Sequence, residues 1–132
     1  MVYTAIDPGK TFGTATYYPD ERLILCIEGD KELVKYLGYQ DRKYIIEVPV
    51  GGDMRISMRA VGYIEGVLDG GLTSRENIIH QSPMKRQKFM GIAKLYEKGH
   101  NQDALAHLLA YTFEHDRHAY DEILSILEEK NA

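Results

Sequence analysis

Acidic side chains follow two apolar runs of this 132-residue chain. Asp7 directly follows the run over residues 3–6, and Glu47 lies near the end of the run over residues 44–48. A carboxylate in such a run is costly unless it is paired or binds a cation. One such residue commonly only caps a turn, but two of them at the ends of neighbouring strands favour a metal site.

A further group of candidate ligands lies in the segment 100–103, which reads His-Asn-Gln-Asp. A spacing of three residues puts His100 and Asp103 on one face of a helical turn, and His107 continues that face. Hard divalent cations such as Mg²⁺ prefer a few oxygen ligands, with water and substrate phosphate completing the coordination shell. Carboxylates from two strands and one helix therefore suit a Mg²⁺ site.

The elements that must position these residues are strands followed by alternating helices and strands. Turn residues and β-branched runs predict strands over 3–6, 12–18, 23–28, 44–48 and 77–80. Capping and glycine signals predict helices over 30–36, 54–69, 83–98, from 101 or 102 to 113, and 120–129. Three early strands joined by short turns indicate an antiparallel meander, and the later alternation indicates a mixed sheet covered on both faces. We therefore expect an α/β fold in a single domain over residues 1–132.

The composition is that of an ordinary globular protein, with 44% hydrophobic and 27% charged residues. A net charge of −4 argues against a generic basic coat for nucleic acid but leaves room for a local basic face. The lone Cys26 excludes an internal disulfide and a cysteine-based zinc cluster, and its apolar surroundings indicate a buried, unreactive thiol. No apolar run approaches the ~20 residues of a membrane helix, and no signal-peptide pattern opens the chain, so we expect an intracellular protein.

Short motifs follow one another in order along most of the chain. They are Asp7-Pro8-Gly9 with Gly13 and Ala15, Ile46-Glu47, Lys85 with Gly91 and Lys94, and Asp103-Ala104-Leu105-Ala106. This order and spacing resembles that of RuvC-type Holliday junction resolvases, which belong to the RNase H-like superfamily. The chain is shorter than the bacterial enzymes, notably between Gly91 and His100, and looks more like the compact versions carried by phages. The resemblance implies the cytoplasm of a bacterium, or of the host cell for a phage protein.

The resemblance also implies a five-stranded RNase H-like fold with a two-metal nuclease site. The family's catalytic quartet falls on Asp7, Glu47, His100 and Asp103, and its third place is Asp in many members and His in some. By resemblance, Asp7 bridges two Mg²⁺ ions, Glu47 holds one of them, and Asp103 holds the other with His100, which otherwise positions water. Mn²⁺ is expected to substitute. Two ions about 3.5–4 Å apart would activate water and stabilise the leaving 3′ oxygen.

A local excess of positive charge lies between the second and third parts of this quartet. The segment 85–98 carries a net charge of +4, and affinity for DNA comes mainly from phosphate neutralisation. A solvated helix face is the alternative interpretation. By resemblance, Lys85 and Lys94 approach phosphates near the cut. The candidate DNA-binding residues are Lys85, Arg86, Lys88 and Lys94, with Arg55 and Arg59 beside the loop 50–52.

The predicted helix over 54–68 is apolar on two sides, so one side can pack on the sheet while the other needs a partner. The two apolar stripes are Met54, Met58, Val61 and Leu68, and Ile56, Tyr63 and Val67. Gly62 and Gly66 would permit close approach of a second helix. In the resembled family this helix builds a two-fold dimer, which predicts an interface at Gly62, Tyr63, Gly66 and Val67. A helix fully buried in a monomer is the alternative.

Together these expectations describe a Mg²⁺-dependent endodeoxyribonuclease that resolves Holliday junctions or other branched DNA as a homodimer that makes paired nicks. Two alternatives stay open: a monomeric RuvC-like RNA-processing nuclease of the YqgF kind, and a non-catalytic protein that binds branched DNA. A phosphate loop at residues 7–11 is rejected, because the Walker pattern needs more glycines and a different ending. Actin-like ATPases are also rejected, because they need two such domains.

Overall fold

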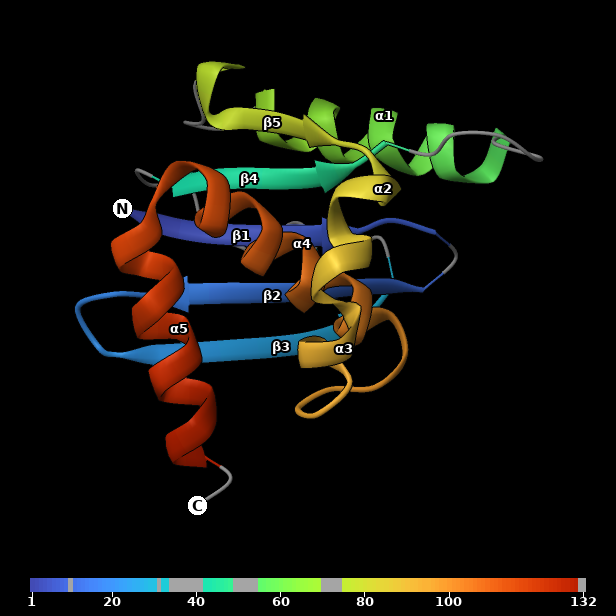
Figure 1. The fold of residues 1–132 in the computed structure, drawn as a ribbon. Coiled ribbons are helices and arrows are strands. Elements are labelled where there is room, and N and C mark those ends of the chain that lie inside the picture. Colours follow the sequence, from blue (N-terminus) through green and yellow to red (C-terminus); the bar gives the residue numbers. More distant parts are fainter. Residues whose placement is uncertain (10, 31, 34–41, 49–54, 70–74, 131–132) are drawn as a thin grey trace.

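The computed structural model describes residues 1–9, 11–30, 32–33, 42–48, 55–69 and 75–130. A single five-stranded sheet with helices on both faces organises them (Figure 1). The strands are β1 (Val2–Asp7), β2 (Phe12–Tyr18), β3 (Leu23–Gly29), β4 (Arg42–Glu47) and β5 (Ile78–Gln81). The predicted α/β class is confirmed, and each observed strand lies within two residues of its predicted bounds.

The strand order of the sheet is β3-β2-β1-β4-β5. β2 pairs antiparallel with both β1 and β3, whereas β4 runs parallel to β1 and β5 runs parallel to β4. This is the predicted meander followed by two parallel strands. The register pairs Ile6 with Ile46, so the carboxyl ends of β1 and β4 lie side by side. Asp7 and Glu47 are therefore neighbours at one edge of the sheet.

Three longer helices cover the sheet: α1 (Arg55–Asp69), α4 (Gly99–His115) and α5 (Arg117–Lys130). α4 and α5 lie on one face and α1 on the other (Figure 1). α4 begins at Gly99, before the predicted start at 101 or 102. Lys98 is extended, and Gly99 takes a positive φ of 59°, which glycine adopts readily. No helix in the described part of the chain is long and apolar enough to span a bilayer.

The prediction of one continuous helix over residues 83–98 is wrong. Residues 83–98 form three short segments, α2 (Pro83–Arg86), η3 (Gln87–Phe89) and α3 (Met90–Ala93), followed by turns. η3 is a 3₁₀ turn with fewer residues per turn than an α-helix, so it redirects the side chains that follow it. Phe89, at the end of this turn, enters the core, whereas Arg86, just before it, faces β4. A short 3₁₀ helix (η2, Arg75–Asn77) precedes β5.

Several predicted features fall outside the described residues. Of the predicted helix over 30–36, the structure describes residues 30, 32 and 33, where the amide of Glu32 donates to the Asp30 carboxylate at 2.9 Å. The loop 50–52, the residues at 53–54 and the glycines at 70–71 also lie outside that part.

Two apolar clusters hold the layers together. The larger cluster packs α4 and α5 against one face of the sheet, and residues 104–112 of α4 are all buried. On the other face, Val61, Ile64 and Leu68 of α1 pack on Ile6 and Ile46. Alternating residues of β1, β2, β4 and β5 therefore point to opposite clusters, as sheet geometry requires.

Cys26 of β3 is partly buried and packs against the larger cluster. Burial raises the pKa of its thiol, and the nearby Glu97 carboxylate raises it further. This environment agrees with the predicted unreactive thiol.

Candidate metal centre

The acidic residues at the strand ends meet the first turn of α4. Asp7 is the last residue of β1 and is only 4% exposed. His100 and Asp103 approach it from α4, and one ligand atom from each of the three residues lies within 4.8 Å of the others. The Nδ1 atom of His100 lies 3.0 Å from Oδ2 of Asp7. Three of the four predicted ligands are therefore brought together.

Close contact with the sheet holds the first turn of α4 in this position. A Cβ atom added at Gly13 would lie 2.2 Å from the backbone carbonyl of His100, so α4 rests directly on the backbone of β2. Gly13 is also the strand partner of Asp7. The resulting requirement for glycine at position 13 follows from this approach, because any side chain there would push the helix away.

Two hydrogen bonds reinforce the contact. The amide of Thr14 donates to the side-chain oxygen of Asn101 at 3.3 Å. The amide of His100, at the exposed start of α4, donates to the Glu28 carboxylate at 2.8 Å. Glu28 thereby satisfies one of the free N–H groups at the helix N-terminus. This role could not be predicted from local patterns, because Glu28 on the edge strand β3 and His100 are 72 residues apart.

Glu47 lies beside Asp7 but is engaged by different partners. Nε of Arg86 donates to Oε1 of Glu47 at 2.9 Å, in an ion pair that is largely shielded from water. Nε2 of the fully buried His107 lies 3.2 Å from the same oxygen. This Nε2 has no well-aligned hydrogen-bond acceptor among the described residues, so its N–H meets the carboxylate obliquely.

The proton on His107 is assigned by its other neighbour, Gln81 at the end of β5. The side-chain nitrogen of Gln81 lies 3.1 Å from the backbone carbonyl of His107 and 2.8 Å from Nδ1 of the same residue. A carbonyl only accepts, so this Gln81 atom must be the amide nitrogen, and it donates to Nδ1 as well. Neutral His107 therefore carries its proton on Nε2, facing Glu47.

The pKa values of Asp7 and Glu47 are shifted in opposite directions. Burial, the neighbouring Glu47 and Asp103 raise the pKa of Asp7 to about 9, although the charge of Arg86 opposes this. Burial would also raise the pKa of Glu47, but His107, the Asp7 hydroxyl and Arg86 outweigh it and lower that pKa to about 2. Without a cation, Asp7 is protonated and Glu47 is ionised at neutral pH.

The donor set fits a hard divalent cation. Two carboxylates and an imidazole converge at a strand end, which is a set of ligands that such a cation accepts. The His100 side chain is 45% exposed, so the cluster opens to solvent on that side. A bound Mg²⁺ or Mn²⁺ would polarise a phosphate and activate water there.

The predicted DNA-binding residues do not form a single group. Arg86, not Lys85, lies beside the carboxylates, since Lys85 points along α4 to an ion pair with Glu114 at 3.1 Å. Lys88 and Lys94 are exposed. Arg59 is exposed on α1, and the side chain of Arg55 lies outside the description.

The predicted dimer helix α1 has a buried and an open side. Gly62 and Gly66 are exposed, and a Cβ added at either would meet nothing within 4 Å. Tyr63 and Val67 are partly exposed, and Val67 also packs against the smaller cluster. The predicted interface residues thus lie on the outer side and flanks of the helix.

No protein-family model matches the chain, and no curated protein matches it either. The case for any function therefore rests on the geometry of the chain and on the motif order in its sequence.

Proposed function

We propose that the chain is a divalent-metal-dependent nuclease that cleaves branched DNA, of the RuvC type within the RNase H-like superfamily. The observation that carries this proposal is the convergence of Asp7, His100 and Asp103 within 4.8 Å, with Glu47 on the adjacent strand. The sheet order, three antiparallel strands followed by two parallel ones, supports it because this is the architecture that the motif resemblance implies.

The roles of the residues follow from their positions. Asp7, His100 and Asp103 would hold one Mg²⁺ or Mn²⁺, and Glu47 would contribute to a second. The bound metal would supply an activated water and stabilise the leaving oxygen. Arg86 pairs with Glu47 and so compensates its buried charge. His107 holds the same carboxylate from the inside of the fold.

A homodimer is part of the proposal. Resolving a four-way junction requires nicks in two opposed strands, and an isologous dimer presents two identical sites related by one two-fold axis. The exposed pair Gly62 and Gly66 on α1 supports this arrangement, because a second helix can approach closely over glycine.

The test is digestion of four-way, three-way and linear DNA, and of RNA, with Mg²⁺ or Mn²⁺ and with chelator as the control. Solution mass is measured in parallel by light scattering. Asp20→Asn is the matched control for Asp7→Asn, since Asp20 is exposed in the turn after β2. We expect symmetric nicks in the four-way junction from a dimer, and loss of cleavage only in Asp7→Asn.

Other outcomes select the alternatives. RNA cut as readily as junctions, by a monomer, would favour the RNA-processing nuclease. Tight binding of branched DNA without any cleavage would favour the non-catalytic binding protein. Failure to bind or cut any of these substrates would refute the proposal.

A further inference from the structure

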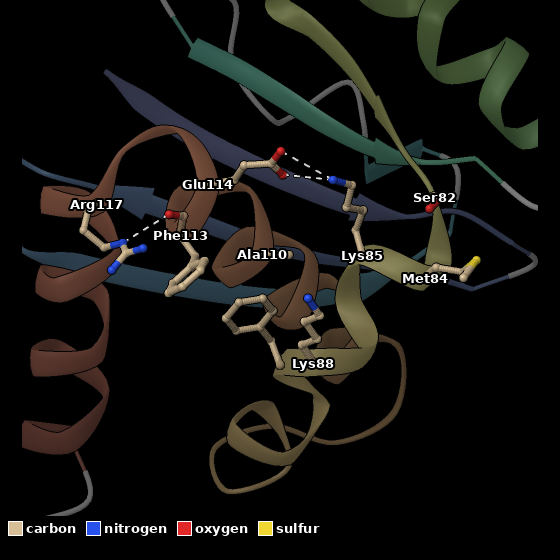
Figure 2. Close-up of a pocket in the computed structure, with 9 residues that line it drawn as sticks. Ser82, Met84, Lys85, Lys88, Ala110, Phe113, Glu114 and Arg117 are labelled. Atoms are coloured by element: carbon tan, nitrogen blue, oxygen red, sulfur yellow. Dashed lines mark hydrogen bonds and ion pairs between the residues drawn. The ribbon is translucent and has the colours of Figure 1, made fainter.

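A cavity of about 680 Å³ lies away from the metal centre, between α2–η3 and the C-terminal half of α4 (Figure 2). Its lining combines two aromatic rings with three cationic side chains. The rings are Phe89 and Phe113, and the cations are Lys85, Lys88 and Arg117. Such a lining suits a ligand that has both a flat apolar part and a negative charge.

The aromatic part of the cavity is fixed in place. The rings of Phe89 and Phe113 lie 5.4 Å apart, and Tyr120 packs edge-on against Phe113 at 5.1 Å. The guanidinium of Arg117 lies 3.8 Å over the Phe113 ring, and its Nε donates to the Phe113 carbonyl. Phe113 nevertheless remains 41% exposed. A large ring held from several sides yet open to solvent is a surface on which a ligand can stack at little entropic cost.

The cationic side chains of the cavity outnumber its acidic ones. Glu114 is the one acidic residue among the described residues that line it, and it pairs with Lys85. Both side chains of this pair are about half exposed, so the pair is weak in water. Lys88 and Arg117 have no acidic partner among the ion pairs of the described residues. Three cations against one acid, in a chain of net charge −4, select an anion.

Two helices, α2 and α4, carry residues of both the cavity and the metal centre. Neighbouring residues of α2 serve both places, because Arg86 contacts Glu47 while Lys85 lines the cavity. On α4, Phe113 of the cavity is ten residues beyond Asp103, or about 15 Å at 1.5 Å per residue. This distance corresponds to about four nucleotide steps of a DNA strand.

We propose that this cavity binds an unpaired nucleotide of the DNA substrate, a few nucleotides from the bond that is cut. The base stacks on Phe113, and the flanking phosphates contact Lys88 and Arg117. Only an unpaired base can offer its face to the ring, because a paired base is stacked within the duplex. The inference rests on the proposed function for the identity of the ligand as DNA.

The test uses a six-nucleotide DNA strand with a central 2-aminopurine and, for comparison, the blunt duplex of the same sequence. Binding is measured in chelator at low salt, so neither metal nor cleavage contributes. We expect tighter binding of the single strand than of the duplex, with quenching of the 2-aminopurine fluorescence by stacking.

Substitutions then locate the binding. Phe113→Leu should weaken binding of the strand about fivefold or more and remove the quenching. Leu95→Ala is the control, since Leu95 is 71% exposed and does not line the cavity. Lys88→Gln and Arg117→Gln should each lower the slope of log affinity against log salt by about 0.7. Lys43→Gln, on β4, should leave that slope unchanged, and circular dichroism melts check that every variant folds.

Equal affinity for strand and duplex would overturn the inference, and so would identical behaviour of Phe113→Leu and Leu95→Ala. Tighter binding of an RNA strand would overturn the choice of DNA. The proposed nuclease and this cavity fail separately. A chain that binds the strand through Phe113 but never cuts branched DNA contradicts the nuclease alone. A chain that cuts while its cavity variants bind normally contradicts the cavity alone.

Discussion

The two ends of α4 use charge in opposite ways. At the N-terminal end, Asp7 and Glu47 are buried; a proton on Asp7 removes its charge, and Arg86 pairs with the charge of Glu47. At the C-terminal end, cationic side chains are exposed around an open aromatic ring. The first arrangement suits a small ion held at fixed geometry, and the second suits a larger anion that adapts to flexible side chains.

The backbone shows the same contrast. The first turn of α4 is held by direct contact with Gly13 and by hydrogen bonds to Thr14 and Glu28. The cavity end depends on side-chain packing around Phe113. A change at one end should therefore leave the other end working, and this independence can be tested in order of expected effect.

Asp7→Asn should have the largest effect. The carboxamide keeps the shape but removes the ligand charge, so we expect Mn²⁺ affinity and cleavage to fall by more than about 100-fold. Losing a residue that only hydrogen-bonds to a ligand typically costs about 10–100-fold. Binding of branched DNA and of the single strand should persist. Calorimetry with Mn²⁺ and gel-shift assays measure the two properties. Loss of strand binding in this variant would break the independence of the two ends.

The same variant should change how stability depends on pH. The pKa of Asp7 is about 9 in the fold, against 3.8 for an aspartate side chain in water, so between these values the folded chain holds one more proton than the unfolded chain. Stability from this residue is therefore lost as pH rises through that window. In chelator, Asp7→Asn should be more stable than wild type at pH 8, by on the order of 1–2 kcal/mol, and gain little at pH 4.5. Thermal melts at the two pH values decide this, and an equal difference at both would contradict it.

Gly13→Ala should have the next largest effect. The added methyl overlaps the His100 carbonyl, so the first turn of α4 must move away from Asp7. We expect a loss of about 1–3 kcal/mol in stability and a marked loss of Mn²⁺ affinity, with strand binding kept. Gly91→Ala is the control, because a Cβ there meets nothing within 4 Å. Comparable damage from both substitutions would show that the close approach at Gly13 has no special importance.

Substitutions at Gln81 should act on the metal centre indirectly. Gln81→Leu leaves the ring and the carbonyl of His107 without their donor, so Glu47 loses a fixed neighbour. Mn²⁺ affinity should fall about tenfold. Gln81→Glu keeps the size but cannot donate when ionised, so it should move the imidazole proton to Nδ1. Nitrogen NMR of the ring reports that proton, and an unchanged tautomer in Gln81→Glu would contradict the assignment.

Glu114→Gln should have the smallest effect. It frees Lys85 from an exposed ion pair, so thermal unfolding should not change measurably. Affinity for the single strand should rise, by less than about fivefold, because exposed pairs contribute little. Fluorescence titration measures this rise. A fall in affinity would show that Glu114 takes part in binding rather than restraining Lys85.

The fold and most of the candidate ligands could be predicted from local patterns. The strand over 12–18 matches its prediction, since Thr and aromatic residues between turn signals determine such a strand locally. Asp7, His100 and Asp103 could be grouped because strand ends and helix spacing place them on one edge. These inferences need only short stretches of sequence.

The partners of the ligands could not be predicted in the same way. Successive residues of a helix point about 100° apart. Lys85 therefore pairs with Glu114 near the C-terminal end of α4, whereas Arg86 pairs with Glu47 at the other end. The break at η3, which follows Arg86, was not marked by any period in the sequence either. Gln81 and Glu28 act only across long sequence separations, which local patterns do not encode.

The metal centre joins residues that are 93 positions apart, Asp7 and His100. The β1–β2–β3 meander consists of neighbouring segments and can form while a chain is still being synthesised, whereas this long-range contact must wait for α4. A ribosome-bound chain that ends before residue 100 lacks two of the three clustered groups. Translation of α4 is therefore the step at which this cluster of candidate ligands can first assemble.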